Sequence, residues 1–546
     1  MKYSVCSVMA PELPFDELCP LLSQLGYDGI EIMGSEGYFI NQFICTQVNQ
    51  REDEWGGDYE NRIRLPIEIV RRTRAHVGDR FIIIYRLSML DLIEHGSSWE
   101  EVAVLAKAIE KAGAPIINTG IGWHEARIPT IATSVPRAAF AGVTAKLKSE
   151  VNIPLITSNR INMPQIGEDI IAAGKEYMVS MARPFLADPE FVKKSMENRA
   201  DEINTCIACN QACLDHTFVN KLTSCLVNPR ACHETELKYI PTTKVKKIAV
   251  IGAGPAGMAA ATVAAERGHE VTLFDSRSEI GGQFNIAKTI PGKEEFYETI
   301  RYFNKRVEVT GVKLLMNTRV SAETLKGQGF DEVLLATGIS PRTPDIPGIK
   351  DAKVLTYLDV LKDKKPVGNR VAIIGAGGIG FDVAEVLVHG NHPSPSLDVN
   401  NFMREWGVDL AVNSRGGVAG VKAQMSASAR EVYLIQRKRS KVGAGLGKTT
   451  GWIHRAVLKN KGVQMISGAS YDKIDAQGLH LTIGENHTLL EVDTIIVCAG
   501  QEPLRELQTD IEALGIKVTL IGGADVASEL DAKRAIKQGS EVAAAL

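Results

Sequence analysis

Residues 246–275 read KKIAVIGAGPAGMAAATVAAERGHEVTLFD, and this stretch decides the fold of the C-terminal part of the chain. A short apolar run enters a glycine-rich turn, a helical stretch follows, and a second apolar run ends at Asp275. Glycines permit a tight turn close to a pyrophosphate, a helix start offers free N–H groups, and the acid binds a ribose hydroxyl. The stretch therefore predicts a dinucleotide site whose turn holds Gly252, Gly254, Ala256 and Gly257.

Residues 369–387, NRVAIIGAGGIGFDVAEVL, repeat the pattern with Gly375, Gly377 and Gly380. Two dinucleotide-binding folds of this kind, one nested in the other, imply that the chain binds two dinucleotides.

The strand of the second fold that normally ends in an acid, EVYLIQRKRS at 431–440, ends in cations instead. Arg437 and Lys438 would attract the 2′-phosphate of NADPH, which an acid would repel, so NADPH is favoured over NADH. A solvated basic turn is the alternative interpretation. Between this strand and the preceding helix lies a detour, His389 to Ala429, longer than a crossover needs.

Two segments, DEVLLATGISPRTPDIPG at 331–348 and DTIIVCAGQEP at 493–503, resemble the crossover segments of two-dinucleotide flavoprotein reductases. That resemblance implies FAD at the first fold, with Gly281, Gly282 and Gln283 near the flavin. It also implies that Asp525, in IGGADVASELDAKRAIKQG, reaches the ribityl chain of the FAD.

Residues 203–232 carry a CxxCx3C cluster and one further cysteine 12 residues later. Four thiolates at this spacing suit a [4Fe–4S] cluster, and the candidate ligands are Cys206, Cys209, Cys213 and Cys225. Structural zinc is the main alternative, although zinc sites usually use two paired CxxC knuckles. Cys232 is interpreted as a spare thiol, but the sequence leaves it open as the fourth ligand.

These motifs line up as an electron path. A hydride from NADPH carries two electrons, FAD accepts both and releases them singly, and an iron–sulfur cluster passes them one at a time. A second flavin must regather them for a hydride acceptor, and we expect that flavin in the N-terminal part of the chain.

Residues 1–195 alternate short apolar runs with amphipathic stretches, the pattern of βα units that feed a parallel sheet. Helices are expected at Asn61–His76 and Ser98–Ala112, the second capped by Ser97 or Ser98. Five strands are predicted, at Asp28–Met33, Phe81–Arg86, Pro115–Thr119, Ile153–Thr157 and Tyr177–Met181. Polar residues follow the strand ends, where a βα barrel has its active site: Ser35, Arg86, His124, Asn159, Arg160 and Arg183.

Five strands are fewer than the eight of a closed barrel, so the sequence predicts a partial one. The predicted fold class is α/β: a partial (β/α)8 barrel, a cysteine-rich segment and two nested Rossmann-like folds. The expected domains are 1–195 for FMN and substrate, 196–243 for the iron–sulfur cluster, 244–360 with 486–546 for FAD, and 361–485 for NADPH.

Composition excludes several classes of protein. The 546 residues are 45% hydrophobic and 23% charged, which is globular rather than collagenous, disordered or coiled-coil. A net charge of −3 offers nothing to attract nucleic acid or an anionic membrane, and neither is expected as a partner. The chain has no apolar run of membrane-spanning length, the first 20 residues do not have a signal-peptide pattern, and clustered cysteines suggest a reducing cytoplasm.

The N-terminal part resembles the old yellow enzyme family, and the whole order of segments resembles the bacterial 2,4-dienoyl-CoA reductases (NADPH). The resemblance rests on GYDGIEIMGSEGYFIN, WGGDYENRIR, IINTGIGWHEARIPT, SMARPFLADP and GKTTGWIHR. It implies FMN, FAD and one [4Fe–4S] cluster, with an acyl-CoA thioester as substrate. The family's first three or so βα units are missing.

The resemblance also implies residue roles. Tyr38 and His124 match the catalytic Tyr and His, which protonate the dienolate formed by hydride transfer. Arg86, Arg160 and Arg183, the last preceded by Ala182, match residues that contact FMN. Read singly, a core Tyr, a capping His and salt-bridged surface arginines are the alternatives.

Two functions remain open for the sequence. One is NADPH-dependent reduction of 2,4-dienoyl-CoA in the oxidation of unsaturated fatty acids, or of another activated alkene. The other is an NADPH:acceptor diaphorase, an electron-transfer module of FAD and cluster with an inactive barrel.

Overall fold

The computed structural model describes residues 4–6, 21, 24–174, 178–528 and 531–546. The chain divides into two compact units. Unit 1 consists of Met1–Ala182 and Pro395–Met425, and unit 2 of Arg183–Ser394 and Ser426–Leu546. Every helix in the described part of the chain is too short or too polar to cross a lipid bilayer.

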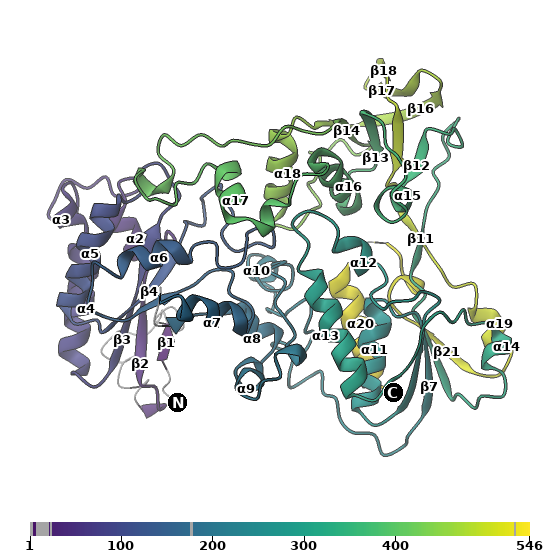
Figure 1. The fold of residues 1–546 in the computed structure, drawn as a ribbon, viewed down its shortest axis with the longest axis horizontal. Coiled ribbons are helices and arrows are strands. Elements are labelled where there is room, and N and C mark those ends of the chain that lie inside the picture. Colours follow the sequence, from purple (N-terminus) through teal and green to yellow (C-terminus); the bar gives the residue numbers. More distant parts are fainter. Residues whose placement is uncertain (1–3, 7–20, 22–23, 175–177, 529–530) are drawn as a thin grey trace. The chain divides into compact units, whose positions relative to one another are not determined.

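Unit 1 is built on a parallel sheet in the order β1–β2–β3–β4–β5–β6 (Figure 1). The strands are β1 Ser4–Cys6, β2 Gly29–Gly34, β3 Ile82–Leu90, β4 Ile116–Ile121, β5 Leu155–Thr157 and β6 Met178–Val179. The five predicted strands are present. Strand β1 is a sixth strand, and its three residues are too few to give a recognisable sequence pattern. Tyr177, where the last predicted strand begins, lies outside the described residues.

Strand β3 runs four residues beyond its predicted end at Arg86. Tyr85, Leu87, Met89 and Leu90 are all buried, so the end of the strand is covered on both faces. A strand buried on both faces reads as a continuous apolar run with no alternation to mark its end, which explains the difference from the prediction.

Helices α4 and α5 lie along one side of this sheet (Figure 1). The sequence predicted Ser97 or Ser98 as the cap of α5, and the cap is Ser98. It forms a capping box, because Ser98 and Glu101 each accept from the backbone N–H of the other. The helices are α2 Phe39–Ile44, α3 Tyr59–Arg62, α4 Arg64–Val77, α5 Trp99–Ala112, α6 Ala141–Leu147 and α7 Pro164–Ala172.

The segment Pro395–Met425 joins unit 1 although it interrupts the second dinucleotide-binding pattern. It contains η3 Pro395–Leu397, α17 Val399–Trp406 and η4 Arg415–Gly417. Its backbone bonds the loop after β3 from both sides: Leu92 N–H donates to Gly416 O at 2.9 Å, and Gly416 N–H donates to Ser97 O at 2.9 Å. Most of the long detour in the sequence, residues 395–425, thus belongs to unit 1.

In unit 2, the first sheet is parallel in the order β21–β10–β7–β8–β9. Its strands are β7 Lys247–Ile251, β8 Glu270–Phe274, β9 Lys313–Leu315, β10 Glu332–Leu335 and β21 Lys517–Leu520. Helices α11 Pro255–Glu266, α13 Phe296–Val309 and α20 Ala532–Ala544 pack together beside it (Figure 1). A Cβ on Gly539 of α20 would lie 2.2 Å from Ala256 O of α11, so this crossing depends on small residues.

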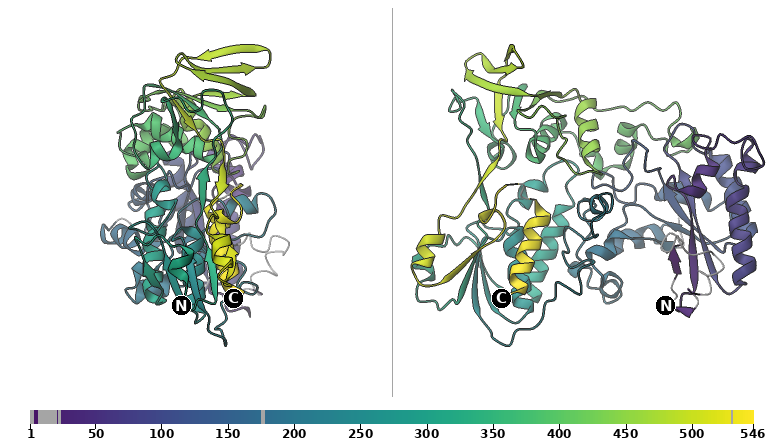
Figure 2. Two further views of the ribbon diagram at one scale, coloured as in Figure 1. Left: turned by 90° about the vertical axis from the view of Figure 1, so that its right-hand side faces the viewer. Right: turned by 180° about the vertical axis from the view of Figure 1, so that it is seen from behind.

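The second sheet is also parallel, in the order β12–β19–β13–β14–β15. Its strands are β12 Val354–Thr356, β13 Arg370–Ile374, β14 Glu431–Gln436, β15 Gln464–Ser467 and β19 Thr494–Val497, with helices α15 Tyr357–Leu361, α16 Gly378–His389 and α18 Gly451–Asn460. An antiparallel sheet extends beyond it (Figure 2), formed by β16 Ala469–Asp475, β17 Gly478–Ile483 and β18 Asn486–Leu490.

The two crossover segments run antiparallel, as β11 Ile339–Pro341 and β20 Gln501–Pro503. The short elements of unit 2 are α8 Arg183–Ala187, α9 Phe191–Met196, η2 Ala200–Glu202, α10 Leu214–Thr217, α12 Phe284–Ala287, α14 Ala322–Leu325, α19 Gln508–Glu512 and η5 Gly522–Ala524. The predicted α/β fold class, with a partial barrel-type sheet and two Rossmann-like sheets, is confirmed.

Candidate active site

Tyr38 and His124 meet in unit 1. Tyr38 is the N-cap residue of α2, and His124 lies in the turn after β4. The Tyr38 Oη and His124 Nε2 atoms are 2.9 Å apart, and the rings make an edge contact with centroids 5.0 Å apart. Tyr38 is 42% exposed. A phenol hydrogen-bonded to an imidazole can pass a proton in either direction.

Arg86 pairs with an acid that the sequence analysis missed. Its Nε and Nη2 atoms donate to Glu36 Oε1 at 3.0 and 2.7 Å. Met33 of β2 lies opposite Arg86 of β3 in the parallel register, which brings Glu36 to the same edge of the sheet. Glu36 O also accepts from the backbone N–H of His124 at 3.4 Å. The position of Glu36, two residues before Tyr38, was the sequence feature that could have indicated this pair.

Arg160 and its neighbour Asn159 both have left-handed backbones, with φ of 57° and 71°. Two consecutive non-glycine residues in this region are uncommon, and such strain concentrates at functional sites. Arg160 is 6% exposed and its Nε donates to Val135 O at 2.8 Å. Ala182 is the last residue of this stretch of unit 1, and Arg183 begins α8 in unit 2.

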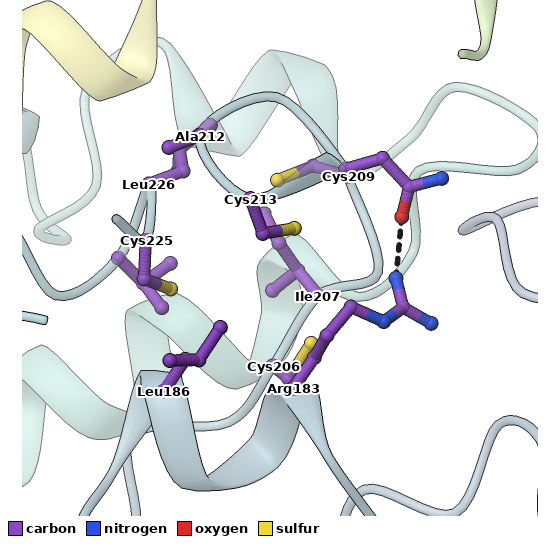
Figure 3. A pocket seen from close by; sticks show the side chains of 11 residues that line it. Arg183, Leu186, Cys206, Ile207, Cys209, Ala212, Cys213, Cys225 and Leu226 are labelled. Carbon is purple, nitrogen blue, oxygen red and sulfur yellow. Dashed lines mark hydrogen bonds between the residues drawn. The ribbon is translucent and has the colours of Figure 1, made fainter. Parts of the chain in front are cut away.

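In unit 2, the four predicted cysteines line one cavity (Figure 3). The guanidinium of Arg183 also lies in its wall and donates to Asn210 Oδ1. The other wall residues include Leu186, Ile207, Ala212 and Leu226. Cys232 is exposed and is not among the residues that line this cavity. The loop thus gathers the cysteines that the sequence singled out.

The environment of these thiols is apolar. Burial raises the pKa of Cys225 to about 12 and the pKa of Cys209 well above its ordinary value. Burial also raises the pKa of Cys213, where the positive charge of Arg183 acts in the opposite direction. Thiolate ligands in such a pocket need a cationic centre to balance their charge. No group of three or more His, Cys, Asp or Glu side chains within the described ranges is close enough to hold a single metal ion.

Both glycine-rich turns have the geometry of pyrophosphate sites. A Cβ on Gly257 would lie 1.8 Å from Gly252 O, and a Cβ on Gly380 would lie 1.9 Å from Gly375 O. A side chain at Gly377 would meet nothing within 4 Å, which leaves the start of α16 accessible. The turns therefore hold the helix starts against the strands and leave space in front for a phosphate group.

Around the first turn, the residues predicted to hold FAD are close together. Asp275 Oδ2 accepts from Ala253 N–H at 2.8 Å, which ties the acid to the turn. A Cβ on Gly282 would lie 2.8 Å from Gly254 Cα, and Gln283 is the N-cap residue of α12. Asp525 follows η5 and accepts from Gln538 Nε2 at 2.7 Å. These contacts fit a flavin dinucleotide laid along the turn.

The cations after β14 are exposed. Gln436 shapes their turn by donating from Nε2 to Lys438 O at 3.0 Å and to Ser440 O at 2.6 Å. In the part of the chain that the structure describes, Arg437 and Lys438 form no ion pair with an acid. Their charge is therefore available to an anionic ligand.

Another pair was missed beside the second turn. His454, in the GKTTGWIHR motif, lies on α18 with its Nδ1 2.6 Å from Glu385 Oε1 of α16. Although burial acts in the opposite direction, the carboxylate of Glu385 raises the pKa of His454 above its ordinary value. A motif on one helix and an acid 69 residues earlier give no local sign of such a pair.

Comparison with known proteins gives matches over most of the chain. Residues 17–202 match the NADH:flavin oxidoreductase / NADH oxidase family, and residues 246–534 match the pyridine nucleotide-disulphide oxidoreductase family. A metal reductase of Desulforamulus reducens is 34% identical over 504 residues, which are 91% of this chain and 74% of that protein. A cinnamate reductase of Clostridium sporogenes is 33% identical over 415 residues, 72% of this chain and 62% of that protein.

A solved structure of 2-naphthoyl-CoA reductase in complex with 2-naphthoyl-CoA is similar to the chain over nearly its whole length. The match has a TM-score of 0.84 and 28% sequence identity, and it covers 96% of this chain and 74% of the other. The similarity extends across both family segments and the cysteine segment between them.

Proposed function

Because the chain belongs to the flavoprotein oxidoreductases in which an NADH:flavin oxidoreductase / NADH oxidase segment is fused to a pyridine nucleotide-disulphide oxidoreductase segment, we propose that it reduces the activated double bond of 2,4-dienoyl-CoA with NADPH. The chain is an oxidoreductase whose families use flavins and a nicotinamide dinucleotide. The substrate, the preference for NADPH and the iron–sulfur cluster are the proposed part.

The observation that carries the proposal is the contact of Tyr38 Oη with His124 Nε2 at 2.9 Å. Reduction of a dienoyl thioester adds a hydride at one carbon and leaves a dienolate that must receive a proton. A phenol with an ordinary pKa of about 10 donates poorly without a partner. His124 orients the hydroxyl and stabilises the tyrosinate that remains after transfer.

The residues around the first turn fit FAD and those around the second fit NADPH, as their contacts above indicate. Gly252 and Gly254 would lie at the FAD pyrophosphate, with Gly257 packing the start of the helix against the turn. Arg437 and Lys438 would bind the 2′-phosphate of NADPH. When bound, NADPH and the flavins supply the hydride chemistry that no side chain can supply. FMN would be held in unit 1, where Arg160 in its strained loop and Arg86 are the candidate contacts.

The cysteine cavity supports a cluster rather than zinc. Tetrahedral zinc requires thiols that converge on one point, about 2.3 Å from the metal. Cys206, Cys209, Cys213 and Cys225 instead line a shared cavity, and within the described ranges no three of them are close enough to hold a single metal ion. Such a cluster would separate the electron pair of a reduced flavin into single transfers.

The relatives' names support a conjugated substrate. The chain is similar to proteins named for cinnamate and for 2-naphthoyl-CoA, both of which carry unsaturation conjugated to a carboxyl carbon. A protonating Tyr–His pair suits a substrate whose carbonyl delocalises the negative charge.

A second candidate function is the NADPH:acceptor diaphorase with an inactive barrel. Reduction of another activated alkene is a variant of the first function. Two observations favour the diaphorase: the described sheet of unit 1 has six strands, and Arg86 is already paired with Glu36. Unit 2 would then pass electrons from NADPH to an external acceptor.

The test is turnover together with cofactor content in the full chain purified without oxygen. We expect FMN, FAD and iron to copurify with the protein. On addition of NADPH, the absorbance of the conjugated diene of a 2,4-dienoyl-CoA should decrease as the substrate is reduced. Tyr38→Phe should lower kcat for the dienoyl thioester by about 10²-fold or more, yet leave NADPH oxidation by an artificial acceptor unchanged. The matched control is Tyr297→Phe, at an exposed tyrosine of α13. Acceptor reduction without FMN or diene turnover would overturn the proposal and favour the diaphorase.

A further inference from the structure

Asp91 is a buried carboxylate at the end of β3 with five hydrogen-bond donors around it. It is 1% exposed. Its Oδ1 accepts from Ser88 Oγ at 2.7 Å, from Trp123 Nε1 at 2.9 Å and from Asn41 Nδ2 at 3.3 Å. Its Oδ2 accepts from Ser97 N–H at 2.7 Å and from Cys45 Sγ at 3.3 Å. The donors come from α2, β3, the loop before α5 and the turn after β4.

Burying a charge is expensive unless hydrogen bonds replace the lost water. Burial and the nearby Asp91 charge both raise the pKa of Cys45, so that side chain stays a thiol and can donate. Asp91 has no ion pair in the described part of the chain, and its charge is balanced by donors alone. An apolar residue at this position would leave five donors without that acceptor, so the carboxylate fixes the segments that carry them.

Two of the donors lead directly to the Tyr38–His124 pair. Trp123 precedes His124 in the chain, and its backbone N–H donates to Asp91 O at 3.0 Å. Asn41 lies one turn after Tyr38 in α2, and its Oδ1 accepts from Gly37 N–H at 2.9 Å. Asp91 therefore holds the residue next to His124 and, through Asn41, the residue next to Tyr38.

The two sides also touch each other. Gly37 has a φ of 81°, and a Cβ there would lie 3.0 Å from Trp123 Cδ2, so the indole ring packs directly on the loop that carries Tyr38. The orientation of this ring is set by the bond from its Nε1 to Asp91. Rotating the indole would displace the chain on both sides of the 2.9 Å contact.

We propose that Asp91 is a positioning residue that keeps Tyr38 and His124 within hydrogen-bonding distance, acting through Trp123 and Asn41. This inference rests on the proposed function in one respect only, namely that the pair donates the proton. Asp91 does not touch the substrate or a cofactor. It sets the geometry in which the pair works, and catalytic rates depend steeply on such geometry.

The experiment is a double-mutant cycle in the full chain. Asp91→Asn replaces one acceptor oxygen by a donor, and Trp123→Phe removes the indole N–H but keeps an aromatic ring. Each should lower kcat for the dienoyl thioester by about 30- to 100-fold, with KM for NADPH and artificial-acceptor turnover unchanged. If Asp91 acts through Trp123, the double variant is no slower than the slower single variant. If the fold-losses in kcat of the two single variants instead multiply in the double variant, the proposal is overturned.

The matched control is Thr73→Val, which removes a buried hydroxyl of α4 that bonds only to Ile69 O among the contacts described here. It should leave kcat unchanged. If Asp91→Asn fails to fold, Trp123→Phe carries the test alone, and full activity in that variant overturns the proposal.

A second readout separates this inference from the proposed function. The 15N signals of the His124 ring, assigned with a His124→Gln variant, should shift in Asp91→Asn and Trp123→Phe and stay in place in Thr73→Val. That result is expected even if the wild-type chain reduces no alkene at all. Unchanged His124 signals in folded Asp91→Asn would overturn the positioning role regardless of turnover.

Discussion

Arg415, in the segment that interrupts the second dinucleotide-binding pattern, donates from Nη1 to Glu101 Oε2 of α5 at 2.7 Å within unit 1. The same Nη1 donates to Gly96 O at 2.8 Å, so one guanidinium caps the loop and the first turn of the helix together. Glu101 also meets Arg62 at 3.1 Å. A carboxylate in the first turn of α5 thus ties two distant parts of the chain to the rim of the sheet.

This anchoring predicts that Gly416→Ala destabilises unit 1. Gly416 has a φ of 60°, and a Cβ would lie 2.1 Å from Ile93 O. An alanine is strained there and its Cβ clashes with backbone, so we expect a loss of about 2–4 kcal/mol in unfolding free energy. Thermal unfolding with a probe in unit 1 measures it.

The matched control for that prediction is Gly420→Ala, in the same segment. Gly420 has a φ of 75°, but a Cβ there would meet nothing within 4 Å. Only the backbone strain remains, and the expected loss is about 1 kcal/mol. Equal losses in the two variants would show that the contact with Ile93 O does not matter.

Coenzyme choice is predicted to depend on Arg437 and Lys438. Replacing both with Ala should raise KM for NADPH by about 10²-fold or more and leave KM for NADH nearly unchanged, because each removes a charge-assisted hydrogen bond of about 1.5–3 kcal/mol. The ratio of kcat/KM for the two coenzymes, with an artificial acceptor, is the measurement. Lys459→Ala, at an exposed lysine of α18, is the control. An unchanged ratio would contradict the prediction.

His454 and Glu385 predict a pH-dependent stability of unit 2. Glu385 raises the pKa of His454, so the folded protein binds the proton more tightly than the unfolded chain does. The stabilisation is complete below the ordinary histidine pKa of about 6.5 and is lost as the pH rises through the raised value.

The measurement is the Tm of wild type and His454→Gln between pH 5.5 and pH 9, a range set by the ordinary pKa of about 6.5. The wild type should exceed the variant most at the acid end, and the difference should shrink as the pH rises. His487→Gln is the control, because the His487 side chain is 84% exposed. A difference in Tm between wild type and His454→Gln that grows with pH would contradict the prediction.

The sequence was most informative where chemistry is local. The turn from Gly252 to Gly257 carries its own steric signature, and the segment from Cys206 to Cys225 holds the four proposed ligands within 20 residues. Pairs such as Glu36 with Arg86 were missed because they depend on the register between two strands.

Long-range contacts were missed for a related reason. Arg415 and Glu101 lie 314 residues apart, and nothing near either residue shows that the detour folds onto the first sheet. Asp91 is one of 65 acidic residues in the sequence, and only its burial against five donors distinguishes it. Burial of a charge is a tertiary property, which no periodicity reports.

The cysteine cavity predicts which thiols hold iron. Cys213→Ser should lose most of its iron and the broad visible absorbance of a cluster, because the serine oxygen is a poor ligand and one corner of the site is lost. Cys232→Ser should keep both, since Cys232 is exposed and does not line the cavity. Iron content per FAD in protein purified without oxygen is the measurement. If Cys232→Ser loses iron as Cys213→Ser does, the fourth ligand is Cys232, and the loop must rearrange when the cluster binds.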